Sequence, residues 1–196
     1  MRIYLIRHGE TDFNREGRYQ GSLDISLSEE GWSKLARAAF CPEVVYTSSM
    51  RRTQETASLI FPEAVLVPVE DLREMSFGDY EGRSKTELAS DPEYVKWLSS
   101  GFTGVCPNAE ESHEEFVHRT ACAFASLVDT GLSQGREVLA VVAHGGTQMA
   151  VLSSFADQDR AFGDWLTGNG EGYVLGTERW ERDRILTVQG QINCCK

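Results

Sequence analysis

A chain of 196 residues is long enough for one well-packed domain and too short for two full ones. Its formal net charge of -11 argues against nucleic acid or an anionic membrane as a partner, because binding either one requires a basic face. No apolar run approaches the roughly 20 residues that span a bilayer.

The five cysteines form no C-x-x-C pair, which is typical of free thiols in a reducing compartment, so we expect a cytoplasmic protein. The sequence leaves the oligomeric state open.

Apolar, β-branched runs alternate with helical patterns along most of the chain. The predicted strands, in chain order, are Arg2–Ile6, Glu43–Thr47, Ala64–Pro68, Glu137–Ala143, Gly172–Gly176 and Arg184–Val188. The predicted helices are Ser28–Phe40, Ser49–Phe61, Pro92–Ser99, Glu110–Leu132 and Thr147–Phe155. This alternation predicts an α/β fold, a three-layer sandwich in which helices cover both faces of a mostly parallel central sheet.

The alternation is broken over residues 75–135, which are mostly helical and loop-like with Gly101, Gly104 and Pro107 in the middle. We interpret this segment as a small helical lid inserted over one edge of the sheet, within a single domain that covers residues 1–196. The run Asn108-Ala-Glu-Glu111 resembles a capping box and predicts the start of the long helix there.

Two of the predicted strands end in the same pattern. The first strand leads directly into Arg7-His8-Gly9, and the most hydrophobic strand of the chain leads into His144-Gly145-Gly146. Either histidine alone has an ordinary structural explanation. Because open α/β folds bind ligands at the carboxyl ends of parallel strands, the repetition predicts two imidazoles at one sheet edge.

Two further segments carry charge beside predicted strand ends. Arg51 and Arg52 fall in the first turn of a predicted helix, where cations oppose the helix dipole by about 0.3–1 kcal/mol each. A bound anion would account for them, and the alternative is a solvated arginine pair. Glu74 follows the third predicted strand, and taken alone it is typical of an exposed loop carboxylate. Arginine supplies 15 of the 19 basic residues, and its planar fork suits phosphate.

Together these segments resemble the histidine phosphatase (phosphoglycerate mutase-like) superfamily, and the resemblance covers nearly the whole chain. It is carried, in family order, by Arg7-His8-Gly9, Asn14, Ser28-Glu-Glu-Gly31, Arg52 with Thr56-Ala57, Glu74, Pro107–Ser112 leading to Arg119, and His144-Gly145. A glycine is more usual in the family where Ala109 or Glu110 stands.

The resemblance implies a catalytic set. His8 would attack phosphorus and form a phosphohistidine, and Glu74 would protonate the leaving oxygen and then activate water. The remaining catalytic residues, which would surround the phosphoryl oxygens, are Arg7, Arg52 and His144. The implied substrate-binding residues are Asn14, Gln20, Gly21 and Gly145.

No metal and no other cofactor is expected. The remaining histidines, His113 and His118, are five residues apart on a predicted helix and do not share a face, so we interpret them as solvated rather than as zinc ligands.

The resemblance favours a phosphatase over a mutase. Related mutases carry paired lid arginines and an Arg-His after the acid glutamate, whereas this chain has separated Arg83, Arg119 and Arg136 and a Met75-Ser76 pair. The expected reaction is hydrolysis of a small phosphorylated metabolite. Phosphoglycerate mutase-type transfer and a non-catalytic binding protein on the same fold are the alternatives.

The lid sequence suggests one particular substrate. Phe77–Gly82 and Asp91–Trp97 resemble the lids of α-ribazole phosphatases, which makes α-ribazole 5'-phosphate the specific hypothesis. Tyr94, Trp97 and Phe102 would either stack on a base-like substrate or form local core.

Overall fold

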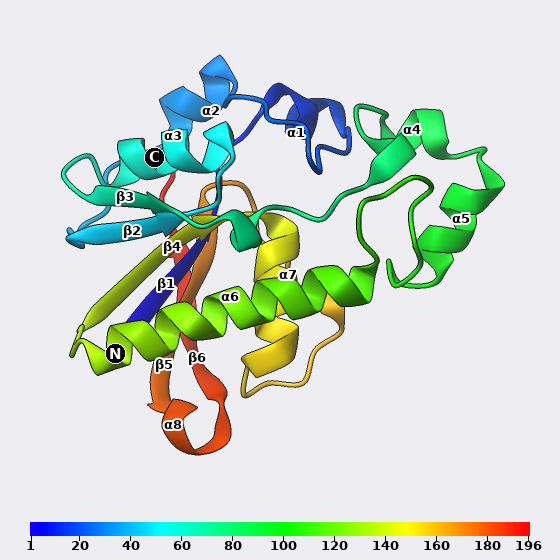
Figure 1. Cartoon of the computed structure of the whole chain (residues 1–196). Helices are drawn as coiled ribbons and strands as arrows, with labels where there is room; N and C mark the ends of the chain where they lie inside the picture. The colour runs from blue at the N-terminus through cyan, green and yellow to red at the C-terminus, as the bar shows by residue number, and fades with distance from the viewer.

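A six-stranded sheet forms the centre of the computed structural model, which describes residues 1–196 (Figure 1). The strand order is β3-β2-β4-β1-β5-β6. The strands are β1 (Arg2–Arg7), β2 (Val44–Thr47), β3 (Val65–Pro68), β4 (Val138–Ala143), β5 (Glu171–Arg179) and β6 (Ile185–Asn193). Strands β1 to β4 run parallel to one another. At one edge of the sheet, β5 pairs antiparallel to β1, and β6 pairs antiparallel to β5. The predicted α/β class with a mostly parallel sheet is confirmed.

The central pair of strands sets the position of both histidine motifs. Strands β1 and β4 are adjacent, parallel and in register, so that Arg7 lies beside Ala143. His8 and His144 therefore leave the sheet at the same level. Both strands are buried on both faces, as their continuous apolar sequences require.

Helices cover the two faces of the sheet, as predicted. They are α1 (Asp12–Glu16), α2 (Glu29–Lys34), α3 (Arg51–Ile60), α4 (Lys85–Leu88), α5 (Pro92–Ser99), α6 (His113–Ser133), α7 (Gly145–Phe155) and α8 (Trp180–Asp183). On one face, α3 packs its Ala57 and Ile60 against Ile6 of β1. On the other face, α6 and α7 pack with Leu5, which points the opposite way along the same strand.

Two of the helix boundaries that differ from the prediction have a clear physical cause. The helix predicted over Ser28–Phe40 ends at Lys34, because Leu35 bridges to Cys195 and the Ala36 N–H donates to the Cys194 carbonyl oxygen. Backbone pairing with the C-terminal tail replaces the helix there. The predicted cap at Asn108 is also wrong, since the capping box of α6 is formed by Ser112 and Glu115.

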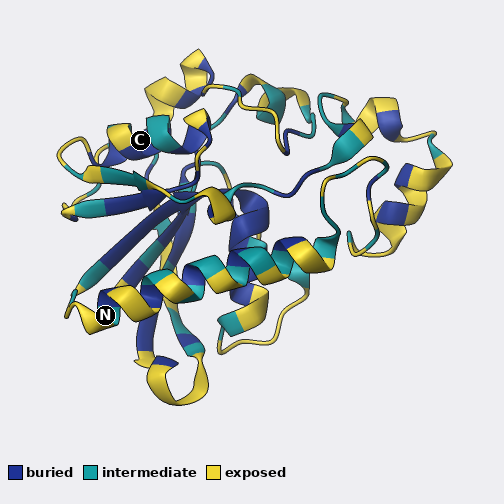
Figure 2. Ribbon diagram, viewed as in Figure 1, coloured by how far each residue is buried: buried dark blue, intermediate teal, exposed yellow.

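An aromatic cluster holds the lid together. Tyr80, Tyr94 and Trp97 pack with the N-terminal end of α6 at Phe116. The other end of α6 belongs to the core of the sheet through Phe124 and Val128. We therefore propose that the lid comprises residues 75–112, rather than 75–135, and use the term for that range. In Figure 1 its helices α4 and α5 stand beside the sheet, and in Figure 2 their inner sides are buried.

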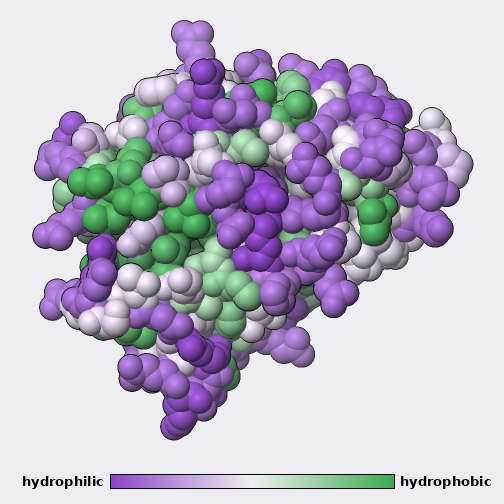
Figure 3. All heavy atoms as spheres, in the orientation of Figure 1, coloured by the Kyte–Doolittle hydropathy of each residue, from purple (hydrophilic) through white to green (hydrophobic).

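The surface agrees with the acidic composition. Figure 3 shows a mainly hydrophilic face, including most of the lid, with a hydrophobic area over the edge strand β3, where Val65 is exposed. None of the helices combines the length and apolarity that crossing a membrane requires.

Candidate active site

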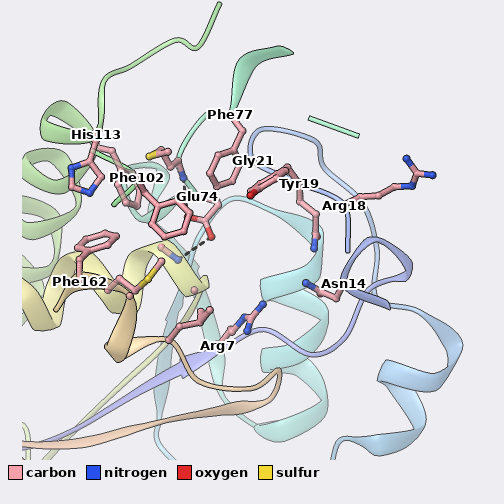
Figure 4. A pocket seen from close by; sticks show the side chains of 18 of the residues that line it. Arg7, Asn14, Arg18, Tyr19, Gly21, Glu74, Phe77, Phe102, His113 and Phe162 are labelled. Atoms are coloured by element: carbon pink, nitrogen blue, oxygen red, sulfur yellow. Dashed lines mark hydrogen bonds between the residues drawn. The ribbon is translucent and has the colours of Figure 1, made fainter. Parts of the chain in front are cut away.

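A cavity of about 360 Å³ is lined both by the carboxyl edge of the parallel strands and by the lid (Figure 4). Eight of the nine residues singled out in the sequence line it: Arg7, His8, Asn14, Gln20, Gly21, Arg52, Glu74 and Gly145. The ninth, His144, lies directly behind, fully buried, with its ring centroid 5.4 Å from that of His8. The structure thus brings the complete set together from five separate stretches of chain.

His8 is held as a neutral imidazole with one free nitrogen. Its Nδ1 lies 2.7 Å from the Gly9 carbonyl oxygen, which only accepts, so Nδ1 carries the proton and donates. The lone pair is left on Nε2. Burial lowers the pKa of His8 well below its usual value, and the nearby charges of Arg52 and Arg7 lower it further. The ring therefore stays unprotonated and nucleophilic at neutral pH.

The two arginines of the cavity are held by backbone carbonyls rather than by carboxylates. Arg7 Nη1 donates to the Thr167 carbonyl oxygen at 2.6 Å, and Arg7 Nε is buried without any partner. Arg52, which is fully buried, donates to the carbonyl oxygens of Leu23 at 2.7 Å and Gly21 at 3.0 Å. Both guanidinium charges remain available to an anion.

The arginine pair at the start of α3 divides between two roles. The Arg51 side chain is exposed, and its backbone N–H donates to the Asp24 carboxylate at 2.7 Å. The helix has no side-chain cap of its own, so Asp24 supplies the anion that we expected at this terminus. Only Arg52 points into the site.

His144 links Arg52 to a buried hydroxyl. Arg52 Nε donates to His144 Nδ1 at 3.3 Å, so the ring proton lies on Nε2, which donates to Ser48 Oγ at 2.7 Å. Burial lowers the pKa of His144 well below its usual value, and the Arg52, His8 and Arg7 neighbours add to this. Sequence reasoning missed Ser48, whose only signal was its position directly after the second strand.

Glu74 presents its carboxylate to the cavity from the loop before the lid. One oxygen, Oε1, accepts the Met75 N–H at 2.9 Å, and Oε2 accepts the Gly146 N–H at 3.1 Å (dashed in Figure 4). Each oxygen keeps a free lone pair, so the group can take or give a proton within the cavity.

Asn14 is oriented by a second asparagine. Its Oδ1 accepts from Asn169 Nδ2 at 3.1 Å and from the Thr11 N–H and hydroxyl, so its amide Nδ2 is left to donate. Asn169 Nδ2 also donates to the His8 carbonyl oxygen at 3.1 Å, which ties the nucleophile's backbone to the loop before β5. Sequence reasoning missed Asn169, whose only signal was its pair of glycine neighbours, which are typical of a turn.

The side of the cavity away from the arginines is largely apolar. Its wall is built from Tyr19, Met75, Phe77, Trp97, Phe102, Phe116, Met149, Phe162 and Leu166. Trp97 and Phe102 therefore serve both the lid core and the cavity, whereas Tyr94 belongs to the core alone. The interpretation of His113 as solvated is wrong: it lines the cavity, with its ring 4.7 Å from that of Phe162. His118 is exposed, as expected.

The model of the histidine phosphatase superfamily, branch 1, matches residues 3–184 of the chain. The chain belongs to this superfamily. His8, Arg52 and His144, which contact or face one another at the carboxyl edge of the parallel strands, all lie within the matched residues.

Relatives of this histidine phosphatase carry several names. A metal-independent phosphoserine phosphatase of Arabidopsis thaliana is 33% identical over 191 residues, covering 91% of this chain and 78% of its own. A phosphoglycerate mutase structure from Thermus thermophilus is 29% identical, with a TM-score of 0.69 and 98% coverage of both chains. The α-ribazole phosphatase structure from Shigella flexneri has a TM-score of 0.80, covering 96% and 95%, at 23% identity, which shows a shared fold.

Gly146 is required for the position of Glu74 in this histidine phosphatase. A Cβ at Gly146 would lie 2.0 Å from Glu74 Oε1, so alanine must push the carboxylate aside. We expect Gly146→Ala to lower kcat for an alkyl phosphate by about 10- to 100-fold, since a misplaced catalytic group costs that much. Because alanine favours helix over glycine by about 1 kcal/mol, the free energy of unfolding should not fall. Steady-state kinetics and urea denaturation measure the two effects.

Gly190→Ala is the matched control, because nothing lies within 4 Å of a Cβ there. Its kcat should equal that of the wild-type protein. Wild-type kcat in Gly146→Ala would show that Glu74 is not fixed by this contact.

Proposed function

We propose that this protein hydrolyses small phosphate monoesters through a phosphohistidine intermediate on His8. The observation that carries the proposal is the neutral, buried imidazole of His8, with its Nε2 lone pair free, beside two guanidinium groups that no carboxylate neutralises. Such an arrangement favours attack on a phosphoryl group, because phosphoryl transfer depends mainly on positioning and on stabilisation of charge.

The reaction has two balanced steps. In the first, His8 Nε2 forms a bond to phosphorus while the bond to the leaving oxygen breaks, and protonated Glu74 gives that oxygen its proton. In the second, Glu74 takes a proton from water, whose oxygen forms a bond to phosphorus while the bond between Nε2 and phosphorus breaks. The electron pair of that bond returns to Nε2, inorganic phosphate leaves, and Glu74 is again protonated. Arg7, Arg52 and the Asn14 amide would bind the phosphoryl oxygens through both steps.

The contacts of the arginines around the lid support hydrolysis over mutase-type transfer. Arg119 of α6 is paired with Glu111 and donates to the Asp71 carbonyl oxygen, and Arg83 of the lid faces Asp91. Neither lines the cavity, and Arg18, which does, is engaged by Glu16 and Glu87. The residues present therefore do not form a paired-arginine clamp for the carboxylate of a phosphoglycerate. The intact set of reacting groups also favours an enzyme over a binding protein on the same fold.

The apolar wall supports α-ribazole 5'-phosphate as the specific substrate. A base-like ring would find aromatic partners in Phe102 and Phe162, and a cavity of about 360 Å³ lies within the range of small-molecule sites. The Shigella neighbour is named for this substrate, and the Arabidopsis relative makes phosphoserine the natural comparison.

The chain contains no cluster of three His, Cys, Asp or Glu side chains suited to a metal, which supports a metal-independent reaction. The five free cysteines support a cytoplasmic setting.

The test is phosphate release from α-ribazole 5'-phosphate, phosphoserine, 3-phosphoglycerate and 4-nitrophenyl phosphate, each measured with and without EDTA. We expect turnover of the nitrophenyl ester that EDTA does not change, and the highest kcat/KM for α-ribazole 5'-phosphate. Loss of turnover in EDTA that Mg²⁺ or Zn²⁺ restores would refute the metal-independent mechanism. A higher kcat/KM for phosphoserine would refute the specific substrate.

A further inference from the structure

Two residues of the cavity wall, Trp97 and His113, each have a ring nitrogen that is buried without a hydrogen-bond partner. An indole N–H can only donate, whereas the histidine nitrogen, Nε2 of His113, can donate or accept. Its neighbours along the wall include Phe116 and Phe162, which offer it no acceptor or donor. Because a buried polar atom without a partner costs free energy, its presence here requires an explanation.

The His113 ring is fixed in place before any ligand arrives. It is the first residue of α6 and lies between Ser112 and Glu115, which form the capping box of that helix. Its ring packs edge-on against Phe162, with the planes inclined by 70°. Figure 4 shows His113, Phe102 and Phe162 together on one side of the cavity, with Arg7 and Asn14 on the other. A ligand whose phosphate meets Arg7 would direct its leaving group toward this wall.

The charge around this wall is unsuited to a carboxylate. Burial lowers the pKa of His113, so the ring is neutral. Arg18, at the cavity rim, is already engaged by Glu16 and Glu87, and Figure 4 shows its guanidinium directed away from the cavity. Lys85 also reaches the lining but is exposed.

We propose that His113 is a specificity-determining residue that hydrogen-bonds one neutral polar atom, a hydroxyl or a ring nitrogen, on an apolar, ring-bearing leaving group. The inference rests on the proposed function, because it assumes that the phosphate binds at Arg7 and Arg52. It assigns the substrate class as ring-bearing alcohol phosphates and excludes small carboxylated alcohols such as phosphoserine.

The test compares benzyl phosphate with its 3-hydroxybenzyl and 3,5-dihydroxybenzyl analogues, whose hydroxyl groups lie meta to the ester-bearing carbon and so cannot expel phosphate without the enzyme. We expect the wild-type protein to prefer at least one hydroxylated analogue about 10-fold in kcat/KM, mostly through KM, and to use phosphoserine poorly. His113→Phe keeps the ring packing against Phe162 but removes the nitrogen. It should reduce the preference to about one, with benzyl phosphate measured on each protein as the reference ester.

His118→Phe, on the exposed side of the same helix, is the matched control and should keep the full preference. His113→Gln retains a polar group and should keep part of the preference for the hydroxylated ester. An unchanged preference in His113→Phe, or a wild-type preference for phosphoserine over every benzyl ester, would overturn the proposal.

If the proposed function is wrong and the protein is not a phosphatase, no ester will release phosphate, which differs from every outcome described above. In that case calorimetric titration of the same benzyl phosphates into the wild-type and His113→Phe proteins decides the question. Tighter binding of a hydroxylated analogue that His113→Phe abolishes upholds the recognition role of His113, and equal binding overturns it.

Discussion

Replacement of His8 by alanine is expected to lower kcat/KM for every phosphate monoester by at least about 10⁴-fold, because it removes the only group that forms the covalent intermediate. In the proposed mechanism the His8 Nε2 lone pair is the nucleophile, and the ring is already oriented by the hydrogen bond from Nδ1 to the Gly9 carbonyl oxygen. His144 cannot take its place, since both of its nitrogens are engaged, by Arg52 and by Ser48.

The measurement is rapid-quench labelling with a ³²P-labelled aryl phosphate, followed by treatment with acid and with base. The wild-type protein should carry acid-labile, base-stable label, and His8→Ala should carry none. His118→Ala, at an exposed site on α6, controls for loss of an imidazole elsewhere and should label normally. Acid-labile label on His8→Ala would place the nucleophile at another histidine.

Glu74→Gln should separate the two chemical steps. Glutamine keeps the size and the acceptor oxygen that receives the Gly146 N–H, but it cannot give or take a proton. With an alkyl phosphate we expect turnover to fall by about 10²- to 10⁴-fold, because the leaving oxygen needs a proton. With 4-nitrophenyl phosphate the first step should be affected much less, since nitrophenolate leaves unprotonated, and phosphohistidine should accumulate because water is no longer activated.

Single-turnover labelling of Glu74→Gln with the nitrophenyl ester measures this accumulation directly. Wild-type turnover of both esters would mean that Glu74 is not the acid. The other two carboxylates of the same loop are poorly placed to replace it. Glu81 Oε1 accepts the Ser22 and Phe77 N–H groups, and Asp79 accepts from Asn108. Neither residue lines the cavity.

The carboxyl ends of the parallel strands could be predicted because each depends on local sequence alone, whereas β5 and β6 continue to Arg179 and Asn193, beyond the predicted Gly176 and Val188. A continuous apolar strand that runs into His-Gly fixes both the element and the position of its histidine, as β1 and β4 confirm. The end of α2 could not be predicted, because Leu35 pairs with Cys195, far away in the sequence. Asn169 and His113 were missed or misjudged for the same physical reason: the role of each depends on partners that only the tertiary fold supplies.

The sheet and the lid are expected to differ in their tolerance to mutation, because the in-register pairing of β1 with β4 involves only the sheet. The spacing between His8 and His144 is set by the pairing of two adjacent central strands, and we expect such a pairing to open only when the sheet itself unfolds. The lid has its own aromatic cluster and can be rebuilt residue by residue without disturbing that pair. If the proposed function holds, substitutions in the lid would alter which leaving group is accepted while the two histidines keep their spacing.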